Sequence, residues 1–363
     1  MMEIIFKDKN LYPIQEKVFK NERLNFDDGL NLYKSNDIIG IGIIADYVRR
    51  KKHGNKAFFV YNQHINYTNI CINNCLFCAF SKKKNEEGSY IYNIEDIKNI
   101  LNDRIDEPIK ELHIVGGINP ELDINYYINI LKTIKEIRSD AAIKAFTAVE
   151  IDHIAKISNM SLEKTIKTLI DAGLALVPGG GAEILNDIIW KKLFPKKISG
   201  DRWLEVVKQI HMTGLKSNAT MLYGHIETLS QRVEHLIKLR QLQDITNGFS
   251  AFIPLAFHSK NTKMSELPST TANDDLKNIA ISRLMLDNFD HIKAYWIMIG
   301  EKLAQIGLSF GADDLDGTII EEKITHTAGA KSAKGLTMEQ LKYMIQSNGF
   351  EPIIRDSFYN EIK

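Results

Sequence analysis

The sequence predicts an α/β protein built as a barrel of eight parallel strands. Apolar segments of strand length alternate with segments in which apolar residues recur every three or four positions. Repeated strand-then-helix order is typical of a parallel sheet, and eight repeats suggest that the sheet closes into a TIM-like (βα)8 barrel. With 363 residues, 44% of them hydrophobic, the chain is long enough for one large barrel domain. An open or partial barrel is the structural alternative.

The elements are expected in the following order. Residues 1–56 form a helical lead-in, with a helix capped near Phe26–Gly29 and another over 38–50. The barrel occupies residues 57–330, and its strands are expected at 65–70, 111–115, 143–147, 175–177, 216–222, 249–255, 292–298 and 307–310. Its helices are expected at 94–101, 126–137, 162–172, 203–212, 231–243 and 274–287. A C-terminal helical extension over 331–363 includes a helix that begins with a capping box at Thr337 to Gln340.

Glycine, polar or charged residues follow most of the predicted strands. They are Gly116-Gly117, Glu150, Pro178-Gly179-Gly180-Gly181, His225, His258 and Gly311-Ala312-Asp313-Asp314. In a parallel barrel these strand ends meet on one face, where active sites are found. We therefore expect an enzyme with its site on that face.

Composition excludes several other classes of protein. The 46 basic and 46 acidic residues balance, and no run of five or six like charges indicates a nucleic-acid surface. The N-terminal residues lack the apolar core of a signal peptide, and the longest apolar runs are much shorter than a membrane span. We expect a cytoplasmic protein without nucleic-acid or membrane partners; a homodimer remains open.

All three cysteines, Cys71, Cys75 and Cys78, lie within eight residues in a C-x3-C-x2-C run. Three thiolates can hold three irons of a [4Fe–4S] cluster and leave the fourth iron open, whereas closed structural sites usually take four ligands. The odd cysteine count in a reducing compartment argues against a disulfide framework. Zinc is the first alternative, but the nearest histidine, His64, lies seven residues upstream on a predicted strand. The second alternative is that the three cysteines are inert thiols that bind no metal.

This run, with Phe77 before the third cysteine, resembles the motif of the radical S-adenosylmethionine (SAM) superfamily. The resemblance implies a barrel of the radical SAM type. It also implies that the amino and carboxylate groups of SAM bind the open iron. The reduced cluster then cleaves SAM into methionine and a 5′-deoxyadenosyl radical, while the protein positions the reactants and excludes water.

A wider set of segments resembles one family within that superfamily, the aminofutalosine synthases of the futalosine route to menaquinone. Tyr67 stands where we would expect proline, and Asn119 where histidine is more usual; neither change removes a group with an assigned role. The similarity spans roughly 55–330 and is carried by residues 64–71, 78–81, 113–120, 144–151, 178–183, 218–228, 252–258 and 309–318.

The family resemblance implies a radical SAM transferase in which SAM is a consumed co-substrate. The deoxyadenosyl radical would add to the vinyl carbon of 3-[(1-carboxyvinyl)oxy]benzoate, an aromatic dicarboxylate. Aryl migration and loss of carbon dioxide would then give 6-amino-6-deoxyfutalosine. A low-potential donor such as flavodoxin or ferredoxin would supply the electron. The alternatives are dehypoxanthine futalosine cyclase, another radical SAM enzyme, an iron–sulfur electron carrier or a zinc-stabilised binding module; a simple carrier needs no cavity formed by eight strand ends.

Candidate SAM-binding residues follow from the resemblance. Phe77 and the backbone near Ala79 would border adenine, and Gly116 and Gly117 would let the backbone approach the methionine part, with a tight strand-to-loop turn as the alternative for these glycines. Glu150 would bond ribose hydroxyls or the methionine amino group, unless it is a solvated loop acid. Gly180, in the glycine run, would help to cradle an anion at the start of the following helix, or belongs to a plain turn.

The two substrate carboxylates require cationic or hydrogen-bonding partners. Arg283 is the candidate cation, although an arginine on a helix is more often a surface or ion-pair residue. His225 and His258 are candidates for binding a carboxylate or assisting proton transfer, with a structural histidine as the alternative for each. Asp313, Asp314 and Asp316 would bond sugar hydroxyls or order lysines.

Overall fold

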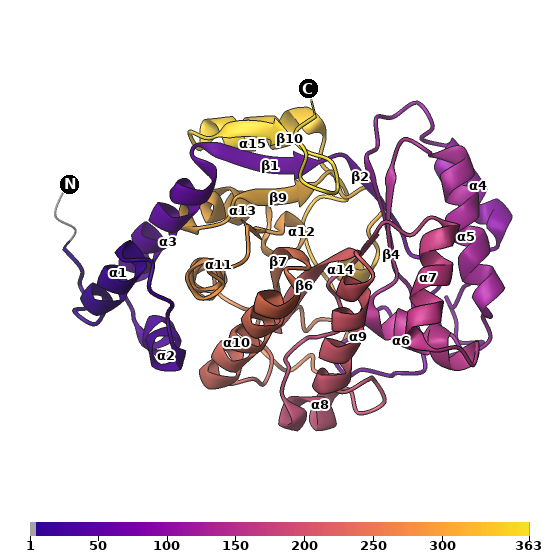
Figure 1. Ribbon diagram of the computed structural model, residues 1–363, viewed down its shortest axis with the longest axis horizontal. Helices are drawn as coiled ribbons and strands as arrows, with labels where there is room; N and C mark the ends of the chain where they lie inside the picture. Colours follow the sequence, from indigo (N-terminus) through magenta and orange to yellow (C-terminus); the bar gives the residue numbers. More distant parts are fainter. Residues whose placement is uncertain (1–4, 363) are drawn as a thin grey trace.

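The computed structural model describes residues 5–362 and contains a curved sheet of seven parallel strands (Figure 1). The strands follow one another in chain order across the sheet, so each strand–helix–strand unit places the next strand beside the last. They are β2 (Asn62–Ile65), β3 (Glu111–Ile114), β4 (Ala142–Ala145), β5 (Leu176–Val177), β6 (Lys216–Tyr223), β7 (Phe249–Ala256) and β8 (His291–Ile292).

Helices connect these strands and cover the outside of the sheet (Figure 1). Each of them starts after an Asn, Asp, Ser or Thr whose side chain accepts a hydrogen bond from a backbone amide in the first turn. The helices are α4 (Ile94–Asn102), α5 (Ile124–Ile137), α6 (Ala148–Ile157), α7 (Leu162–Ala172), α8 (Asp187–Leu193), α9 (Gly200–Met212), α10 (Leu229–Thr246) and α11 (Ala272–Met285).

A second sheet of three parallel strands lies at the open edge of the first. Its central strand β1 (Lys56–Val60) pairs with β9 (Asp314–Gly317) and β10 (Glu351–Ile354). The segment 313–320 also bonds to both edges of the larger sheet: the Ala294 amide donates to Asp314 (2.8 Å), and the His64 amide donates to Ile320 (2.9 Å). This segment therefore occupies the eighth position, and the expected barrel is confirmed as a fold class.

Several sequence-based boundaries are wrong. The first barrel strand was expected over 65–70 but ends at Ile65, because the next residues turn into the loop that carries the cysteines. The expected eighth strand at 307–310 instead forms the end of α13 (Glu301–Gly307) and the 3-10 turn η1 (Leu308–Phe310). Residues 292–298 are only briefly extended before α12 (Trp296–Ile299). Short apolar runs fit a buried helix as well as a strand.

The chain outside the barrel includes the expected helices. The lead-in forms α1 (Leu11–Phe19), α2 (Phe26–Lys34) and α3 (Ile38–His53), and α3 packs against α11 and η1. Asn25 and Asp28 form a capping box at the start of α2. After the short helix α14 (Ile324–Thr327), the expected capping box of Thr337 and Gln340 starts α15 (Met338–Ser347). The C-terminal extension is not only helical, since it also contains β10.

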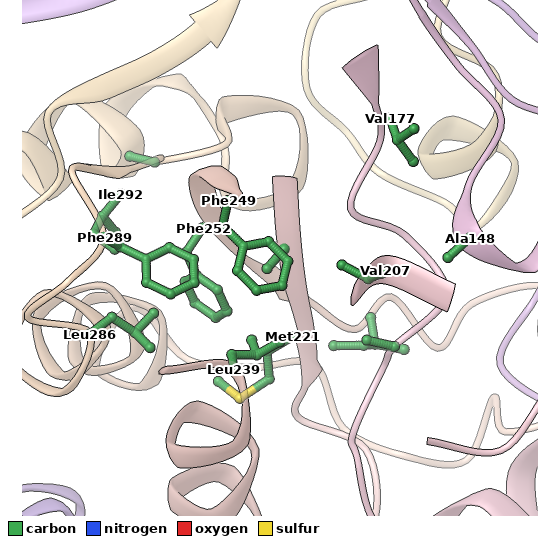
Figure 2. Packing of buried hydrophobic residues seen from close by; sticks show 14 of the residues in the cluster. Ala148, Val177, Val207, Met221, Leu239, Phe249, Phe252, Leu286, Phe289 and Ile292 are labelled. Atoms are coloured by element: carbon green, nitrogen blue, oxygen red, sulfur yellow. The ribbon is translucent and has the colours of Figure 1, made fainter. Parts of the chain in front are cut away.

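The apolar core lies between the sheet and the helices. Figure 2 shows Phe249 and Phe252 of β7 beside Phe289, and the rings of Phe249 and Phe289 are stacked with centroids 5.2 Å apart. Met221 and Leu239 pack on the same cluster and are fully buried. This packing holds β6 to β8 against α10 and α11. Among the described residues, no helix has the combination of length and apolarity that crossing a membrane requires.

Candidate active site

The loop after β2 carries all three cysteines on the wall of a cavity of about 350 Å³. The cavity lies at the carboxyl ends of the strands, and its size falls within the range of small-molecule sites. Backbone hydrogen bonds hold the loop: the Cys71 amide donates to Lys82 (3.0 Å), and the Ile72 amide donates to Ile118 (3.0 Å). Cys71, Cys75 and Cys78 are unpaired and partly exposed.

The donor set of this loop fits an iron–sulfur cluster better than a zinc ion. Among the described residues, the three cysteines do not form a group whose ligand atoms all lie within 4.8 Å of one another. Thiolates around one tetrahedral zinc lie closer together than that, since each zinc–sulfur bond is about 2.3 Å long. Burial raises the pKa of the Cys75 thiol to about 12, and it also raises the pKa of Cys78. Deprotonation of these thiols is therefore tied to the arrival of a metal.

Lys197, which sequence reasoning missed, lies beside the cysteine loop. Its ammonium group pairs with the carboxylate of Glu183 and lies 5.6 Å from the centre of the Phe77 ring. Both members of the pair are largely buried and line the cavity. The positive charge partly offsets the effect of burial on the pKa of the Cys75 thiol. Lys197 lies far from the cysteines in sequence, so no local motif identifies it.

Glu150 is buried in the third position of α6 rather than at the end of a strand. Its Oε2 accepts hydrogen bonds from the amide and the hydroxyl of Thr147, both at 2.7 Å. Its Oε1 accepts from the Tyr67 hydroxyl (2.7 Å) and the Gly116 amide (3.0 Å). Burial raises the pKa of Glu150, against the effect of these donors. The alternative of a solvated loop acid is therefore wrong, and the carboxylate links β3 and α6 to the cysteine loop.

The three glycines that were expected to contact SAM or an anion have different surroundings. Gly116 lines the cavity and leaves room for the Tyr67 ring, which a Cβ on Gly116 would meet at 2.6 Å. Gly117 does not line the cavity, and a Cβ there would overlap the carbonyl oxygen of Ile70 in the cysteine loop. Gly180 lines the cavity and has space around it. The next helix, α8, starts only at Asp187. Gly180 therefore does not lie at a helix N-terminus, contrary to the expectation.

Three more of the predicted site residues line the cavity, whereas His225 does not. Phe77, Ala79 and His258 are among its lining residues, and Nε2 of His258 lies 2.8 Å from the carbonyl oxygen of Met298. His225 follows β6 but does not line the cavity. Its Nδ1 lies 2.9 Å from the Glu227 carboxylate, and its Nε2 lies 3.0 Å from the Leu222 carbonyl oxygen. These contacts correct its expected role and identify it as a structural histidine of the turn.

The expectation that Arg283 binds a substrate carboxylate is also corrected. Arg283 is fully buried, does not line the cavity and pairs with Asp313. Its remaining donors go to the carbonyl oxygens of Gly311 (2.8 Å) and Asp290 (2.9 Å) and, at 3.4 Å, to that of Phe289. Its guanidinium is thus used in joining α11 to the segments that precede β8 and β9.

The acidic segment serves mainly to pair buried cations. Asp314 accepts from Nε of Arg355 (2.7 Å), and Asp316 accepts from Nζ of Lys293 (3.1 Å). Of the two, only Asp316 lines the cavity. The expected role in ordering lysines therefore holds for Asp316.

A row of polar residues that sequence reasoning did not single out lines the cavity inside the barrel. His64 on β2, His113 on β3 and Lys144 on β4 are register partners on neighbouring strands and all line the cavity. His64 was named only as the histidine nearest to the cysteines, and the segments that contain all three residues were otherwise noted only for their resemblance to a family. Their proximity depends on the pairing of three strands that are distant in sequence.

Comparison with known proteins identifies the class that this fold and site define. The family model of the radical SAM superfamily matches residues 65–239, and the model of the CofH/MqnC C-terminal region matches residues 246–363. The crystal structure of methylornithine synthase (PylB) superposes with a TM-score of 0.76 over 93% of this chain and 97% of that chain, at 17% identity. The chain is thus a radical SAM enzyme, and Cys71, Cys75 and Cys78 fit the motif with which this superfamily binds its [4Fe–4S] cluster beside SAM.

Relatives define the family more narrowly. The aminodeoxyfutalosine synthase of Thermus thermophilus is 42% identical, over 98% of this chain and 97% of its own length. The 5-amino-6-(D-ribitylamino)uracil–L-tyrosine 4-hydroxyphenyl transferase of Archaeoglobus fulgidus is 38% identical, over 87% of this chain and 92% of its own length. The chain belongs to the aminodeoxyfutalosine synthase family of radical SAM enzymes.

Proposed function

We propose that this enzyme joins the adenosyl part of SAM to 3-[(1-carboxyvinyl)oxy]benzoate and forms 6-amino-6-deoxyfutalosine. The single observation that carries the proposal is the cysteine triad, without a fourth cysteine in the chain, on the wall of the cavity. The identity of 42% to a synthase over almost the whole chain supports the choice of substrate.

A [4Fe–4S] cluster held by Cys71, Cys75 and Cys78 would supply the electron that splits SAM into methionine and the 5′-deoxyadenosyl radical. That radical forms a carbon–carbon bond with the vinyl carbon of the substrate. Migration of the aryl group and loss of carbon dioxide follow, and one electron leaves the product radical. Return of that electron to the cluster would leave no net consumption of reductant. SAM is consumed, since its adenosyl part stays in the product.

The protein binds and orients the reactants and excludes water from them. Cys71, Cys75 and Cys78 would hold the cluster, and Gly116, which lines the cavity, would let the backbone approach the methionine part of SAM. Tyr67 and Glu150 fix that backbone, because Oε1 of Glu150 accepts from both the Tyr67 hydroxyl and the Gly116 amide. Nonpolar atoms form most of the cavity surface, which protects a radical from solvent.

We also propose that a low-potential flavodoxin or ferredoxin delivers the electron at the cysteine loop. Ile72, next to Cys71, is about half exposed, and a cluster held by this loop would lie near the surface. Lys82, Lys83 and Lys84 follow in the same loop; Lys82 pairs with Glu86 and Lys84 with Glu121, and an acidic carrier would compete for these lysines.

The proposal is tested with anaerobically reconstituted enzyme, SAM, dithionite and the enolpyruvyl benzoate. Mass spectrometry should detect 6-amino-6-deoxyfutalosine, and Cys75→Ala should form none while it retains the native circular dichroism spectrum. Release of 5′-deoxyadenosine without an adduct would favour a hydrogen-abstracting enzyme such as dehypoxanthine futalosine cyclase. A parallel reaction with L-tyrosine and 5-amino-6-(D-ribitylamino)uracil, the substrates in the name of the archaeal relatives, should give no product.

A further inference from the structure

The row of His64, His113 and Lys144 lies deeper in the barrel than the cysteines. Each of the three is the next-to-last residue of its strand, whereas the cysteines follow the end of β2. Register partners on parallel strands point to the same face of a sheet. Because all three side chains line the cavity, that face is the barrel interior.

This part of the interior is polar, although barrel interiors are usually filled by branched aliphatic side chains. Nζ of Lys144 pairs with Oε2 of Glu111 at 2.5 Å, and both residues are almost completely buried. Buried ion pairs contribute little to stability compared with apolar packing, because removing the charges from water is unfavourable. The polar row is therefore better explained by ligand binding than by folding.

His64 provides a second, independent observation. Only 6% of its surface is exposed, and its Nε2 has no hydrogen-bond partner among the described residues. Its ring stacks on that of His113, with centroids 4.4 Å apart and an angle of 4° between the planes. Buried polar atoms in proteins nearly always have partners, so a histidine nitrogen without one in a cavity wall points to a missing ligand.

The charges around the row can accept an anion. The ionised groups that act on His64 are Glu322, Asp316 and Glu111, which are negative, and Lys144, which is positive. Lys144 pairs with Glu111, Lys293 with Asp316, and His326 with Glu322. Each nearby acid therefore has a cationic partner, and an entering carboxylate meets paired charges and imidazole N–H donors.

We propose that His64, His113 and Lys144 form the subsite for the ring carboxylate of an aromatic dicarboxylate substrate. The inference rests on the proposed function, in which the vinyl carbon must face SAM at the cysteine end. The benzoate carboxylate is meta to the vinyl ether on the ring and so extends away from SAM into the barrel. Of the lysines and arginines, only Lys144 and Lys197 line the described cavity, and Lys197 lies beside the cysteine loop. Lys144 thus takes the place that Arg283 was expected to fill.

The test measures substrate binding to reconstituted enzyme with SAM but without reductant, so that no turnover occurs. Two ligands are compared by anaerobic calorimetry: 3-[(1-carboxyvinyl)oxy]benzoate, and 2-phenoxyacrylate, which lacks the ring carboxylate. His64→Asn and His113→Asn should each weaken binding of the dicarboxylate by about 10- to 100-fold, the range of a hydrogen bond to a charged group. They should change binding of 2-phenoxyacrylate by less than about 2-fold.

His153→Asn is the matched control, because His153 is a half-buried histidine on α6 that does not line the cavity. It should bind both ligands as the wild type does. Equal weakening of both ligands by His64→Asn and His113→Asn, or no weakening of either, overturns the subsite. If the wild type forms the adduct in such a case, the proposed function stands and only the subsite fails. A wild type that binds neither ligand and forms no adduct overturns both.

Discussion

Replacing Arg283 with methionine should destabilise the protein without a selective effect on substrate binding. The side chain is fully buried and pairs with Asp313, which is equally buried. Arg283→Met would leave Asp313 with Nδ1 of His291 at 2.5 Å and the Ile292 amide at 2.8 Å. It would also leave the carbonyl oxygens of Gly311 and Asp290 without their donors.

The magnitude follows from that burial. Breaking a buried ion pair by removing one partner costs about 3–5 kcal/mol; Asp313 keeps its contact with His291, but the carbonyl oxygens of Gly311 and Asp290 also lose their donors. At ~2.1 cal/mol/K per residue, the unfolding entropy of a chain of this length is about 0.8 kcal/mol/K, so Tm should fall by about 4–7 °C. Burial opposes ionisation of Asp313, but His291 and then the Arg283 guanidinium hold its pKa well below its usual range, so the Arg283 contribution is complete at neutral pH and is lost as the pH falls into the acid range.

Thermal unfolding followed by circular dichroism, together with KM for the aromatic substrate, provides the assay. Arg50→Met is the matched control, since Arg50 is half exposed and pairs with Asp46 one helical turn away. An exposed pair of this kind contributes no more than about 1 kcal/mol, and Tm should change by less than about 2 °C. An Arg283→Met enzyme with wild-type Tm and a strongly raised KM would refute the reasoning and restore Arg283 as a substrate ligand.

Two further predictions concern the cysteine loop and the pH dependence of stability. Gly117→Ala should displace the Ile70 backbone and reduce the iron bound after reconstitution, measured by visible absorption and iron analysis. Gly335→Ala, where the nearest atom to the new Cβ lies 3.6 Å away, should bind iron normally, and full iron content in both would contradict the packing argument. A hydrogen bond to Glu322 raises the pKa of His326 from 6.5 to about 9. Its contribution to stability is therefore complete below pH 6.5 and is lost as the pH rises through 9, so His326→Asn should flatten the decline in urea midpoint between these values; an unchanged slope would count against the pair.

Local patterns were sufficient to predict the cysteine loop and many helix starts. Cys71, Cys75 and Cys78 form a motif within eight residues, and the capping box at Thr337 depends only on neighbours three positions apart. The same pattern, Thr147 followed by Glu150, could have identified the start of α6 and the buried position of the carboxylate. The start of α6 was missed because the predicted strand over 143–147 included Thr147, which is the capping residue of this helix.

Side-chain partners across the barrel were not predictable in this way. Whether Arg283 faces the cavity or the interior behind it depends on how α11 packs, which a helical period does not specify. The row of His64, His113 and Lys144 depends on strand register, and a shift by one residue would turn each side chain to the other face. The eighth barrel position was missed because β9 is short and carries two aspartates, which a search for apolar strands passes over.

The most direct test of the proposed chemistry is the fate of the 5′ carbon of SAM. SAM labelled with carbon-13 at that position is incubated with the reconstituted enzyme, reductant and 3-[(1-carboxyvinyl)oxy]benzoate. Radical addition predicts that the label is found in 6-amino-6-deoxyfutalosine, joined to a substrate carbon with one-bond carbon–carbon coupling when the vinyl carbon is also labelled. Recovery of all the label in free 5′-deoxyadenosine would contradict the proposal that this cavity joins the two molecules.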